Sequence, residues 1–319
     1  MVPHVPPPEA VRDANHKIMT TRAPAGIYPM QYAFFDRRGE LDRAAMRRQA
    51  EAAVRGGAHG VAVLGLATEV GKLSSEERRR LIDWVTQDIG GRVPVAVTIA
   101  GATVPEQVDL ARYAQAAGAA WLILQPPPER GRPESEYEAF FAQVMASVDL
   151  PVAIQNAPEY TGIGLGDEAL ARLALAHPNF ALLKGEGPAL TIRRTIEAVG
   201  GRLRVFNGRG GLELPDNLRA GCAGMIPATD NFDYQVRVFE LMRDGDALAI
   251  ERAEAIYRDV LPAIVFVMHS LDSLICYGKR LAAMRMGMGE VSDRQPAMTP
   301  HPFGLECVRR YATQLRSLA

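Results

Sequence analysis

The sequence predicts an α/β fold, namely a (β/α)8 TIM barrel with a C-terminal helical extension. Short runs of apolar and β-branched residues occur eight times, and stretches with helical periodicity and helical end signals separate them. The runs are continuously apolar, which is typical of strands buried on both faces of a parallel sheet. Eight such strands alternating with helices favour a closed barrel over a doubly wound sheet. No G-x-G-x-x-G opens a helix after the first strand, which disfavours dinucleotide binding.

The predicted strands share a short apolar core rich in Val, Ile, Leu and Ala. In chain order they are 26–28, 60–64, 93–97, 121–124, 151–154, 180–183, 203–206 and 224–226. The intervening helices have their own start and stop signals: Ser74 and Glu77 form a capping box, and glycines such as Gly118 follow the last helical residue. In chain order these helices are 42–55, one beginning at Ser74, 105–117, 134–147, 167–176, 189–199 and 215–219.

After the eighth strand the chain remains helical, beyond what closing a barrel requires. The pattern predicts helices over 234–242, 246–260, 262–274 and 277–286, with a break at Pro262, and a last helix over 306–318. We therefore divide the chain into an extended, proline-rich N-terminal arm (1–21), a barrel (22–245) and a C-terminal helical region (246–319).

Composition restricts the classes of function. The 319 residues carry a net charge of −1 with acidic and basic residues interspersed, so we expect no nucleic-acid or membrane partner. The three cysteines are far apart and no histidine pair has metal-ligand spacing, so neither disulfides nor a metal are expected. The N-terminus lacks the pattern of a signal peptide. These features favour a cytoplasmic protein with a small, uncharged or singly charged substrate.

Lys184 is the first candidate catalytic residue. It ends the apolar run 180–183 and is followed by Gly185-Glu186-Gly187. In a (β/α)8 barrel the residues just beyond the strands form the active site, so this strand would present an amine to the substrate. An ordinary lysine amine is protonated at neutral pH, whereas an apolar barrel interior favours the free, nucleophilic amine. The pattern therefore favours Schiff-base chemistry, although a solvated lysine at a strand end has the same local sequence.

The segments that follow the other strands supply the remaining candidates. They are 65–69 after strand two, 125–128 after strand four, 155–160 after strand five, 207–211 after strand seven and 227–231 after strand eight. The glycine-rich segment 207–211 lacks the lysine and serine of a P-loop, so we expect a tight turn there and not a phosphate site.

This set of segments resembles the dihydrodipicolinate synthase and N-acetylneuraminate lyase family of class I Schiff-base lyases. The family has a Gly-Thr-Thr-Gly-Glu-like loop after strand two, Tyr-Asn-x-Pro-x-Arg-Thr-Gly after strand five, and its Schiff-base lysine in a context like Ile-Lys-Glu. Those places are taken here by Gly65-Leu66-Ala67-Thr68-Glu69, by Gln155-Asn156-Ala157-Pro158-Glu159-Tyr160-Thr161-Gly162 and by Leu183-Lys184-Gly185-Glu186. The resemblance extends from about Ala23 to the C-terminal helices.

The departures from the family pattern bear on the reaction. Gln155 replaces the tyrosine that relays protons, Leu66-Ala67 replace the hydroxyl pair, and Tyr160 replaces the arginine of dihydrodipicolinate synthases. These replacements disfavour dihydrodipicolinate synthase and sialic acid lyase. The Gln-Asn-Ala-Pro segment and Lys184-Gly185-Glu186-Gly187-Pro188 are closest to the branch that contains L-2-keto-3-deoxyarabonate dehydratase, which also lacks the tyrosine.

The resemblance implies a lyase acting on a 2-keto-3-deoxy sugar acid or related 2-oxo acid, with dehydration favoured. A retro-aldolase that releases pyruvate is the runner-up, a non-catalytic barrel that binds a 2-oxo acid is an alternative, and dihydrodipicolinate synthase is a distant one. It also implies a homotetramer that needs neither a metal nor another cofactor. The catalytic candidates are Lys184, Glu186 and Gln155, where glutamine orients a group and cannot itself transfer a proton at neutral pH.

Candidates for proton transfer are Glu186, Thr68, Tyr160 and a water held by Gln155 or Asn156. We expect the loop 65–69 to bind the substrate carboxylate through backbone N–H groups. The candidate substrate-binding residues are Leu66, Ala67, Thr68, Asn156, Tyr160, Asn207 and Gly208. Glu69 and the distant Lys279 are interpreted as structural.

Overall fold

The structure of the protein is a computed structural model that describes residues 23–319, so the predicted arm over residues 1–21 lies outside the described part. Eight parallel strands form one sheet in the order β1-β8-β7-β6-β5-β4-β3-β2. The strands are β1 (Gly26–Ile27), β2 (Val61–Val63), β3 (Val95–Ile99), β4 (Trp121–Leu124), β5 (Val152–Asn156), β6 (Phe180–Gly185), β7 (Arg204–Asn207) and β8 (Gly224–Met225). Each of the eight runs predicted from the sequence overlaps one of them, and β3, β5, β6 and β7 extend one or two residues beyond the predicted ends.

The sheet closes between β1 and β2, which stand at the two ends of this order. Just after β1, the N–H of Gln31 donates to the carbonyl of Ala62 at 2.8 Å, and the N–H of Ala62 donates to the carbonyl of Pro29 at 3.0 Å. These bonds join the segment after β1 to β2 and complete the ring, so no strand edge is left exposed. The predicted (β/α)8 barrel is confirmed.

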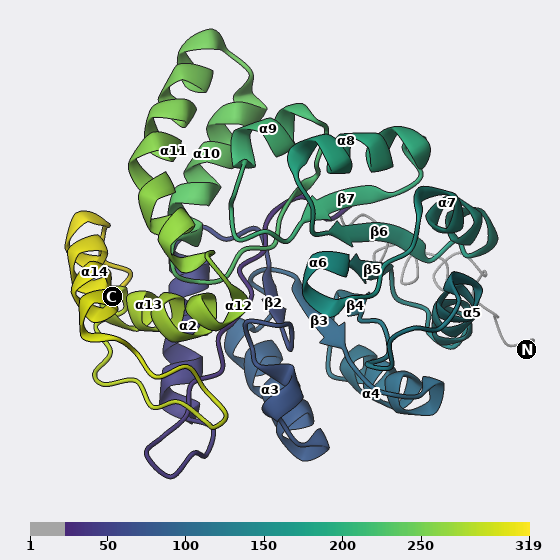
Figure 1. Cartoon of the computed structure of the whole chain (residues 1–319), viewed down its shortest axis with the longest axis horizontal. Helices are drawn as coiled ribbons and strands as arrows, with labels where there is room; N and C mark the ends of the chain where they lie inside the picture. Colours follow the sequence, from purple (N-terminus) through teal and green to yellow (C-terminus); the bar gives the residue numbers. More distant parts are fainter. Residues whose placement is uncertain (1–22) are drawn as a thin grey trace, which may run out of the picture.

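Helices surround the barrel on its outside (Figure 1). They are α2 (Arg43–Arg55), α3 (Ser75–Ile89), α4 (Val104–Ala116), α5 (Glu134–Met145), α7 (Asp167–Ala176), α8 (Ala189–Ala198), α9 (Leu214–Arg219) and α10 (Phe232–Asp244). The capping box predicted for Ser74 and Glu77 is present in full at the start of α3. Two short helical segments were not predicted: Val70–Lys72 and α6 (Pro158–Thr161).

Three large aromatic side chains pack against one another in the buried core. The rings of Tyr28, Trp121 and Phe206 are all buried and pack with centroids 5.4 to 5.7 Å apart. Trp121 is the first residue of β4, and Phe206 lies near the end of β7. The three rings form one packed aromatic cluster, and in a (β/α)8 barrel the site is expected at the C-terminal ends of the strands.

The C-terminal helices differ from the sequence prediction. A break at Pro262 was expected, but α11 runs without interruption over Ala247–Val267 and contains Pro262. Buried Val260, Ala263 and Ile264 surround the proline, and burial of this apolar face outweighs the one backbone hydrogen bond that proline removes. The helix instead ends before Ser270, whose side chain caps the next turn.

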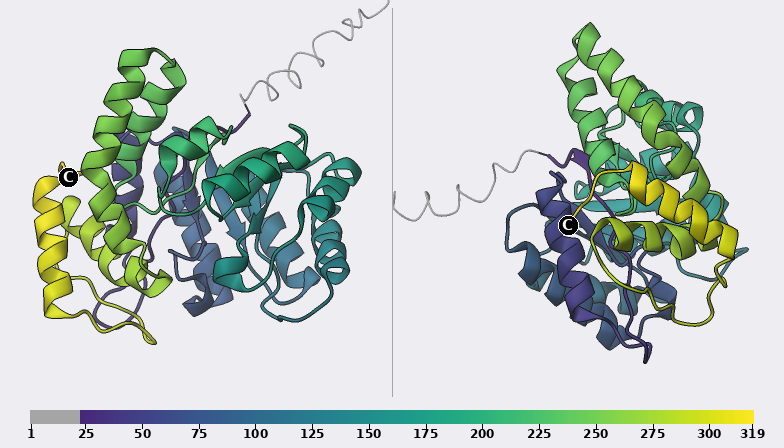
Figure 2. Two further views of the ribbon diagram at one scale, coloured as in Figure 1. Left: turned by 45° about the horizontal axis from the view of Figure 1, so that its top comes forward. Right: turned by 90° about the vertical axis from the view of Figure 1, so that its left-hand side faces the viewer.

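Beyond Ser270 the chain forms α12 (Leu271–Ser273), a π-helical turn (Leu274–Gly278) and α13 (Lys279–Arg285). The last helix, α14 (Pro302–Gln314), begins earlier than predicted because Pro302 occupies its first turn and His301 caps it. Figure 2 shows α10 and α11 as a pair that projects beyond the barrel, with α13 and α14 beside it. Within residues 23–319 no helix by itself combines the length and apolar composition needed to cross a membrane; α11 and Leu271–Arg285 meet those criteria only as a pair bent by 107°.

Candidate active site

Lys184 lies inside the barrel near the C-terminal end of β6. Its neighbours across the sheet are Gln155 on β5 and Phe206 on β7. Alternation along the strand turns Lys184 inward, while the next residue, Gly185, faces outward against Ile192 of α8. Lys184 is only 4% exposed. The β6 sequence therefore places a single amine at the centre of the barrel mouth.

Glu186 is the direct partner of this amine. The Nζ of Lys184 lies 2.6 Å from Oε1 of Glu186, and both side chains are buried. The Nε2 of Gln155 donates to the same oxygen at 2.6 Å. The other oxygen, Oε2, accepts no hydrogen bond from the residues that the structure describes. One oxygen of Glu186 is therefore held by two donors, and the other is available to exchange a proton.

A second glutamine holds Gln155 in place. The Nε2 of Gln125, which directly follows β4, donates to Oε1 of Gln155 at 2.9 Å. The Nε2 of Gln107 in α4 donates to the backbone carbonyl of Gln125 at 2.8 Å. Gln155 thus occupies the position of the missing tyrosine as an amide whose nitrogen and oxygen each form a hydrogen bond. Gln125 lies in the candidate segment 125–128, but the sequence analysis assigned it no catalytic or substrate-binding role.

Gly208 makes room for the lysine and glutamate. A Cβ atom at this position would lie 2.8 Å from Cε of Lys184 and 2.8 Å from Cγ of Glu186. Such contacts are shorter than van der Waals packing allows, so any side chain at this position would displace Lys184 and Glu186. The glycine after β7 is therefore required by the geometry of the site.

Six of the predicted site residues line one cavity of about 40 Å³. They are Lys184, Glu186, Leu66, Ala67, Tyr160 and Gly208. Met30, Ile226 and Leu274 supply apolar walls. Leu66 and Tyr160 also border a wider cleft of about 490 Å³, which extends past Gln125 and the prolines 126–128 to Arg130. A narrow apolar chamber around the amine thus adjoins a wider cleft.

Tyr160 lies in α6, between the chamber and the cleft. Burial raises the pKa of its hydroxyl above the ordinary value, the negative charge of Glu186 raises it further, and Arg209 opposes both effects. The hydroxyl therefore stays protonated at neutral pH and can donate a hydrogen bond into the chamber.

Three other predicted residues form hydrogen bonds within the protein instead. The hydroxyl of Thr68 donates to the carbonyl of Gln31 at 2.6 Å, and Asn156 bonds to the backbone of Leu165 in both directions. The amide of Asn207 donates to the carbonyl of Gly187 and to Asn217. These side chains stabilise the loops that carry the chamber walls.

The loop after β2 presents backbone groups to the chamber. Leu64 and Glu69, which flank this loop, both have positive φ, 66° and 55°. The N–H groups of Leu66 and Ala67 have no hydrogen-bond acceptor within residues 23–319. Neighbouring free N–H groups in such a turn form an anion-binding concavity.

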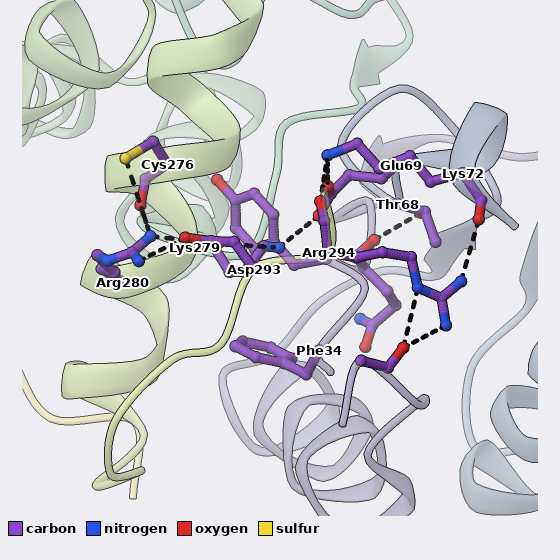
Figure 3. Close-up of polar contacts among 12 residues, drawn as sticks. Phe34, Thr68, Glu69, Lys72, Cys276, Lys279, Arg280, Asp293 and Arg294 are labelled. Atoms are coloured by element: carbon purple, nitrogen blue, oxygen red, sulfur yellow. Dashed lines mark hydrogen bonds and ion pairs between the residues drawn. The ribbon is translucent and has the colours of Figure 1, made fainter. Parts of the chain in front are cut away.

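A cluster of buried charges anchors this loop to the C-terminal region (Figure 3). Glu69 forms ion pairs with Lys72, at 2.6 Å, and with Lys279 of α13. Asp293 lies 3.7 Å from Lys279 and 2.5 Å from Arg280. The cluster ties segments more than two hundred residues apart, so the C-terminal helices help to shape the chamber.

Comparisons with known proteins agree with this geometry. Residues 23–300 match the dihydrodipicolinate synthetase family. The chain is 30% identical over 268 residues to the probable 2-dehydro-3-deoxy-D-pentonate aldolase YjhH of Escherichia coli K12. The matched residues cover 82% of this chain and 88% of that protein. It is 36% identical over 199 residues to a 4-hydroxy-tetrahydrodipicolinate synthase of Thermus thermophilus, 61% of this chain and 66% of that protein.

Solved structures show the same fold. The crystal structure of YagE from E. coli K12 in complex with pyruvate superposes with a TM-score of 0.84 at 24% identity, covering 92% of this chain and 99% of that chain. A dihydrodipicolinate synthetase-like protein from Pseudomonas aeruginosa gives a TM-score of 0.85 at 24% identity, covering 92% and 100%.

A buried lysine near the end of β6 inside a closed barrel is an arrangement suited to Schiff-base lyases built on the (β/α)8 fold. The chain belongs to the dihydrodipicolinate synthetase family. Members of this family are lyases, among them keto-deoxy sugar acid aldolases and dihydrodipicolinate synthases.

Proposed function

We propose that this protein is a Schiff-base-forming lyase that removes water from a 2-keto-3-deoxy sugar acid. The observation that carries the proposal is the buried pair of Lys184 and Glu186, 2.6 Å apart, at one wall of the chamber. The apolar walls and the family membership support a covalent role for this amine.

In the first step, Nζ of Lys184 attacks the C2 carbonyl carbon of the substrate. The carbinolamine loses water and becomes an iminium, which draws electrons from C3 and makes its protons acidic. Removal of one C3 proton gives an enamine. The enamine then expels the C4 hydroxyl, which takes up a proton and leaves as water. The resulting C3–C4 double bond shifts to give the C5 enol, which tautomerises to an aldehyde. Water then hydrolyses the iminium, restores the C2 ketone and frees Lys184. The water released when the iminium formed is thereby returned, so the net change is the loss of one water molecule from the sugar acid.

Glu186 is the best-placed group to move these protons. Its Oε1 is held by Lys184 and Gln155, and its Oε2 is free of donors from the described residues. Oε2 can accept the proton from C3 and deliver it to the hydroxyl on C4, because C3 and C4 are adjacent carbons of the substrate. Gln155 orients the carboxylate, and Tyr160, protonated at neutral pH, serves as a hydrogen-bond donor.

The substrate carboxylate fits the loop after β2. The free N–H groups of Leu66 and Ala67 bind it in this proposal, and their side chains form part of the chamber wall. The family's hydroxyl pair is replaced here by Leu66 and Ala67, so the backbone has to supply the polar contacts. Thr68, Asn156 and Asn207 support the neighbouring loops.

A retro-aldolase is the second candidate, and the names of two relatives favour it. YjhH is named a probable 2-dehydro-3-deoxy-D-pentonate aldolase, and YagE, 30% identical over 226 residues, a putative 2-dehydro-3-deoxy-D-gluconate aldolase. An aldolase cleaves the C3–C4 bond after deprotonating the C4 hydroxyl, and the same iminium accepts the electrons. The replacement of the proton-relaying tyrosine by Gln155 favours dehydration.

The test combines trapping with product analysis. Wild type and Lys184→Met are reduced with borohydride in the presence of pyruvate or L-2-keto-3-deoxyarabonate, and intact masses are measured. We expect an adduct in the wild type and none in the variant, together with formation of a semialdehyde and no pyruvate. Release of pyruvate would assign the aldolase reaction, and an adduct without turnover would assign a binding protein. Absence of any adduct would remove the Schiff-base mechanism.

We also propose a cytoplasmic homotetramer, as the family resemblance implies. Light scattering coupled to gel filtration of the purified protein measures its mass directly. A species of four chains supports the proposal, and a monomer at micromolar concentration contradicts it.

A further inference from the structure

The chain of amides behind the catalytic pair has a fixed direction. It starts at Oε1 of Glu186, continues through Gln155 and ends at Gln125. An ionised carboxylate only accepts hydrogen bonds, so Gln155 must turn its NH2 group toward Glu186. Its carbonyl oxygen therefore faces Gln125, which in turn must present its own NH2 group. The charge of Glu186 thus determines the orientation of both amides.

The reversed arrangement is excluded by its energy. It would bring the carbonyl oxygen of Gln155 against Oε1 of Glu186, so that two hydrogen-bond acceptors would face each other without a proton between them. Gln155 and Gln125 are 1% and 7% exposed, so little water reaches them to offset this repulsion. The proton that Glu186 exchanges goes to Oε2, so Oε1 remains an acceptor and the direction persists during the reaction.

The fixed direction of these hydrogen bonds determines which atom of Gln125 remains without a partner. With its NH2 group committed to Gln155, Gln125 has one polar side-chain atom left, the carbonyl oxygen Oε1. That oxygen has no donor within residues 23–319, and Gln125 lines the wide cleft beyond Tyr160. The cleft wall therefore carries a hydrogen-bond acceptor whose direction is set by the catalytic carboxylate.

We propose that Gln125 is a specificity-determining residue that accepts a hydrogen bond from a substrate hydroxyl beyond C3. This inference rests on the proposed Schiff-base function, since the substrate must extend from Lys184 past Tyr160 into the cleft. A hydroxyl group can donate to this oxygen, whereas an alkyl group at the same place leaves it desolvated and without a partner. The residue thus selects polyhydroxylated 2-oxo acids over their alkyl counterparts.

Two compounds with the same carbon skeleton test the selection. 2-Keto-3-deoxypentonate and 2-oxopentanoate differ only in the hydroxyls at C4 and C5. Half-saturating concentrations are measured by early borohydride trapping and, independently of any adduct, by protection against thermal unfolding. For Gln125→Met we expect the value for the hydroxylated compound to rise about five- to tenfold, as for loss of one neutral hydrogen bond, with the value for 2-oxopentanoate changing less than about twofold.

An isosteric variant tests the link to Glu186. In Gln125→Glu at neutral pH, a carboxylate faces the carbonyl of Gln155, and Gln155 turns its NH2 group away from Glu186. We expect kcat to fall at neutral pH and to recover toward acid pH, where the new carboxyl is protonated and donates as the amide does. The matched control is Gln143→Met, an exposed glutamine on α5, which should change neither quantity.

Several outcomes would overturn the proposal. In Gln125→Met, the half-saturating concentrations of both compounds could rise equally, or the preference for the hydroxylated compound could stay unchanged. The wild type could also respond equally to the two compounds or respond to neither. A rate loss in Gln125→Glu that does not depend on pH would remove the orienting role. Discrimination by protection without any trapped adduct would leave this inference standing and remove the proposed Schiff-base function.

Discussion

Two buried lysines in this protein have opposite environments. Lys184 on β6 is 4% exposed, faces the chamber and pairs with a single carboxylate, Glu186. Lys279 on α13 is completely buried and lies between two carboxylates, Glu69 and Asp293. Burial and an ion pair are common to both. What separates them is that an electrophile can reach Lys184 through a cavity, while protein atoms surround Lys279.

The carboxylates that pair with the two lysines also differ in how many other partners they have. Glu186 also accepts a hydrogen bond from the neutral amide of Gln155, and its second oxygen has no donor among residues 23–319. Each carboxylate beside Lys279 instead pairs with a further cation, Lys72 or Arg280 (Figure 3). A fully compensated cluster holds its charges in fixed positions and stabilises the contact between the β2 loop and the C-terminal helices. An incompletely satisfied pair beside a cavity is suited to covalent chemistry.

Substitution of Lys184 should have the largest effect on activity. We expect Lys184→Met to lower kcat/KM at least ~10³-fold, the scale on which loss of a covalent nucleophile acts. Turnover and borohydride trapping measure this effect. A variant that retains a trapped adduct on another lysine would contradict the assignment.

Lys279→Met should affect stability instead. Its removal takes away the buried cation that Glu69 and Asp293 share, while Lys72 and Arg280 still pair with one carboxylate each. We therefore expect a loss of about 3 kcal/mol in the free energy of unfolding, the lower end of the range for a broken buried pair. Urea denaturation measures the loss, and the folded fraction should still trap 2-oxo acids. If Lys279→Met kept full stability and lost adduct formation, the contrast between the two lysines would be wrong.

Glu186→Gln separates Schiff-base formation from proton transfer. The amide is isosteric and leaves Lys184 free to attack, but it cannot accept the C3 proton, so we expect kcat to fall roughly 10²- to 10⁴-fold with trapping retained. The exposed Glu197, which pairs with Arg193 on α8, provides the control Glu197→Gln. Parallel loss of trapping and turnover in Glu186→Gln would assign the glutamate to lysine activation alone.

Asp230, just after β8, gives a third environment for a buried charge. Burial raises its pKa from the ordinary value of 3.8 to about 6, with the bond from Tyr32 opposing the shift. The folded state therefore binds a proton that the unfolded state has released, so this residue lowers stability as the pH rises from about 4 to about 6. The loss should reach about 3 kcal/mol, and Asp230→Asn should not show it. Denaturation midpoints across this range measure the difference, and parallel curves for the two proteins would refute the prediction.

The smallest effect should come from Lys72. It pairs with Glu69 at 2.6 Å but is partly exposed, and Lys279 still compensates the carboxylate when Lys72 is absent. We expect Lys72→Met to lower the free energy of unfolding by about 1 kcal/mol or less. A loss as large as that of Lys279→Met would show that the cluster acts as one unit.

Sequence reasoning predicted the parts of the fold that depend on local patterns. The eight apolar runs became eight strands, and the capping box of Ser74 is present. The break expected at Pro262 was wrong, because the cost of proline in a helix is local while the packing of α11 depends on distant partners. The same limit applies to Thr68, whose bond to the backbone of Gln31 depends on how two loops meet.

By itself the sequence determined the barrel and the place of Lys184, because strand periodicity and chain order fix which residues reach the mouth of a parallel barrel. Only the tertiary structure decided that Glu186 turns back onto Lys184, that Gln155 and Gln125 form one directed chain, and that Lys279 is enclosed. These contacts join residues on different strands and helices. Their hydrogen bonds have favourable energies only within a narrow range of distance and direction, which the spacing of residues along the chain does not specify.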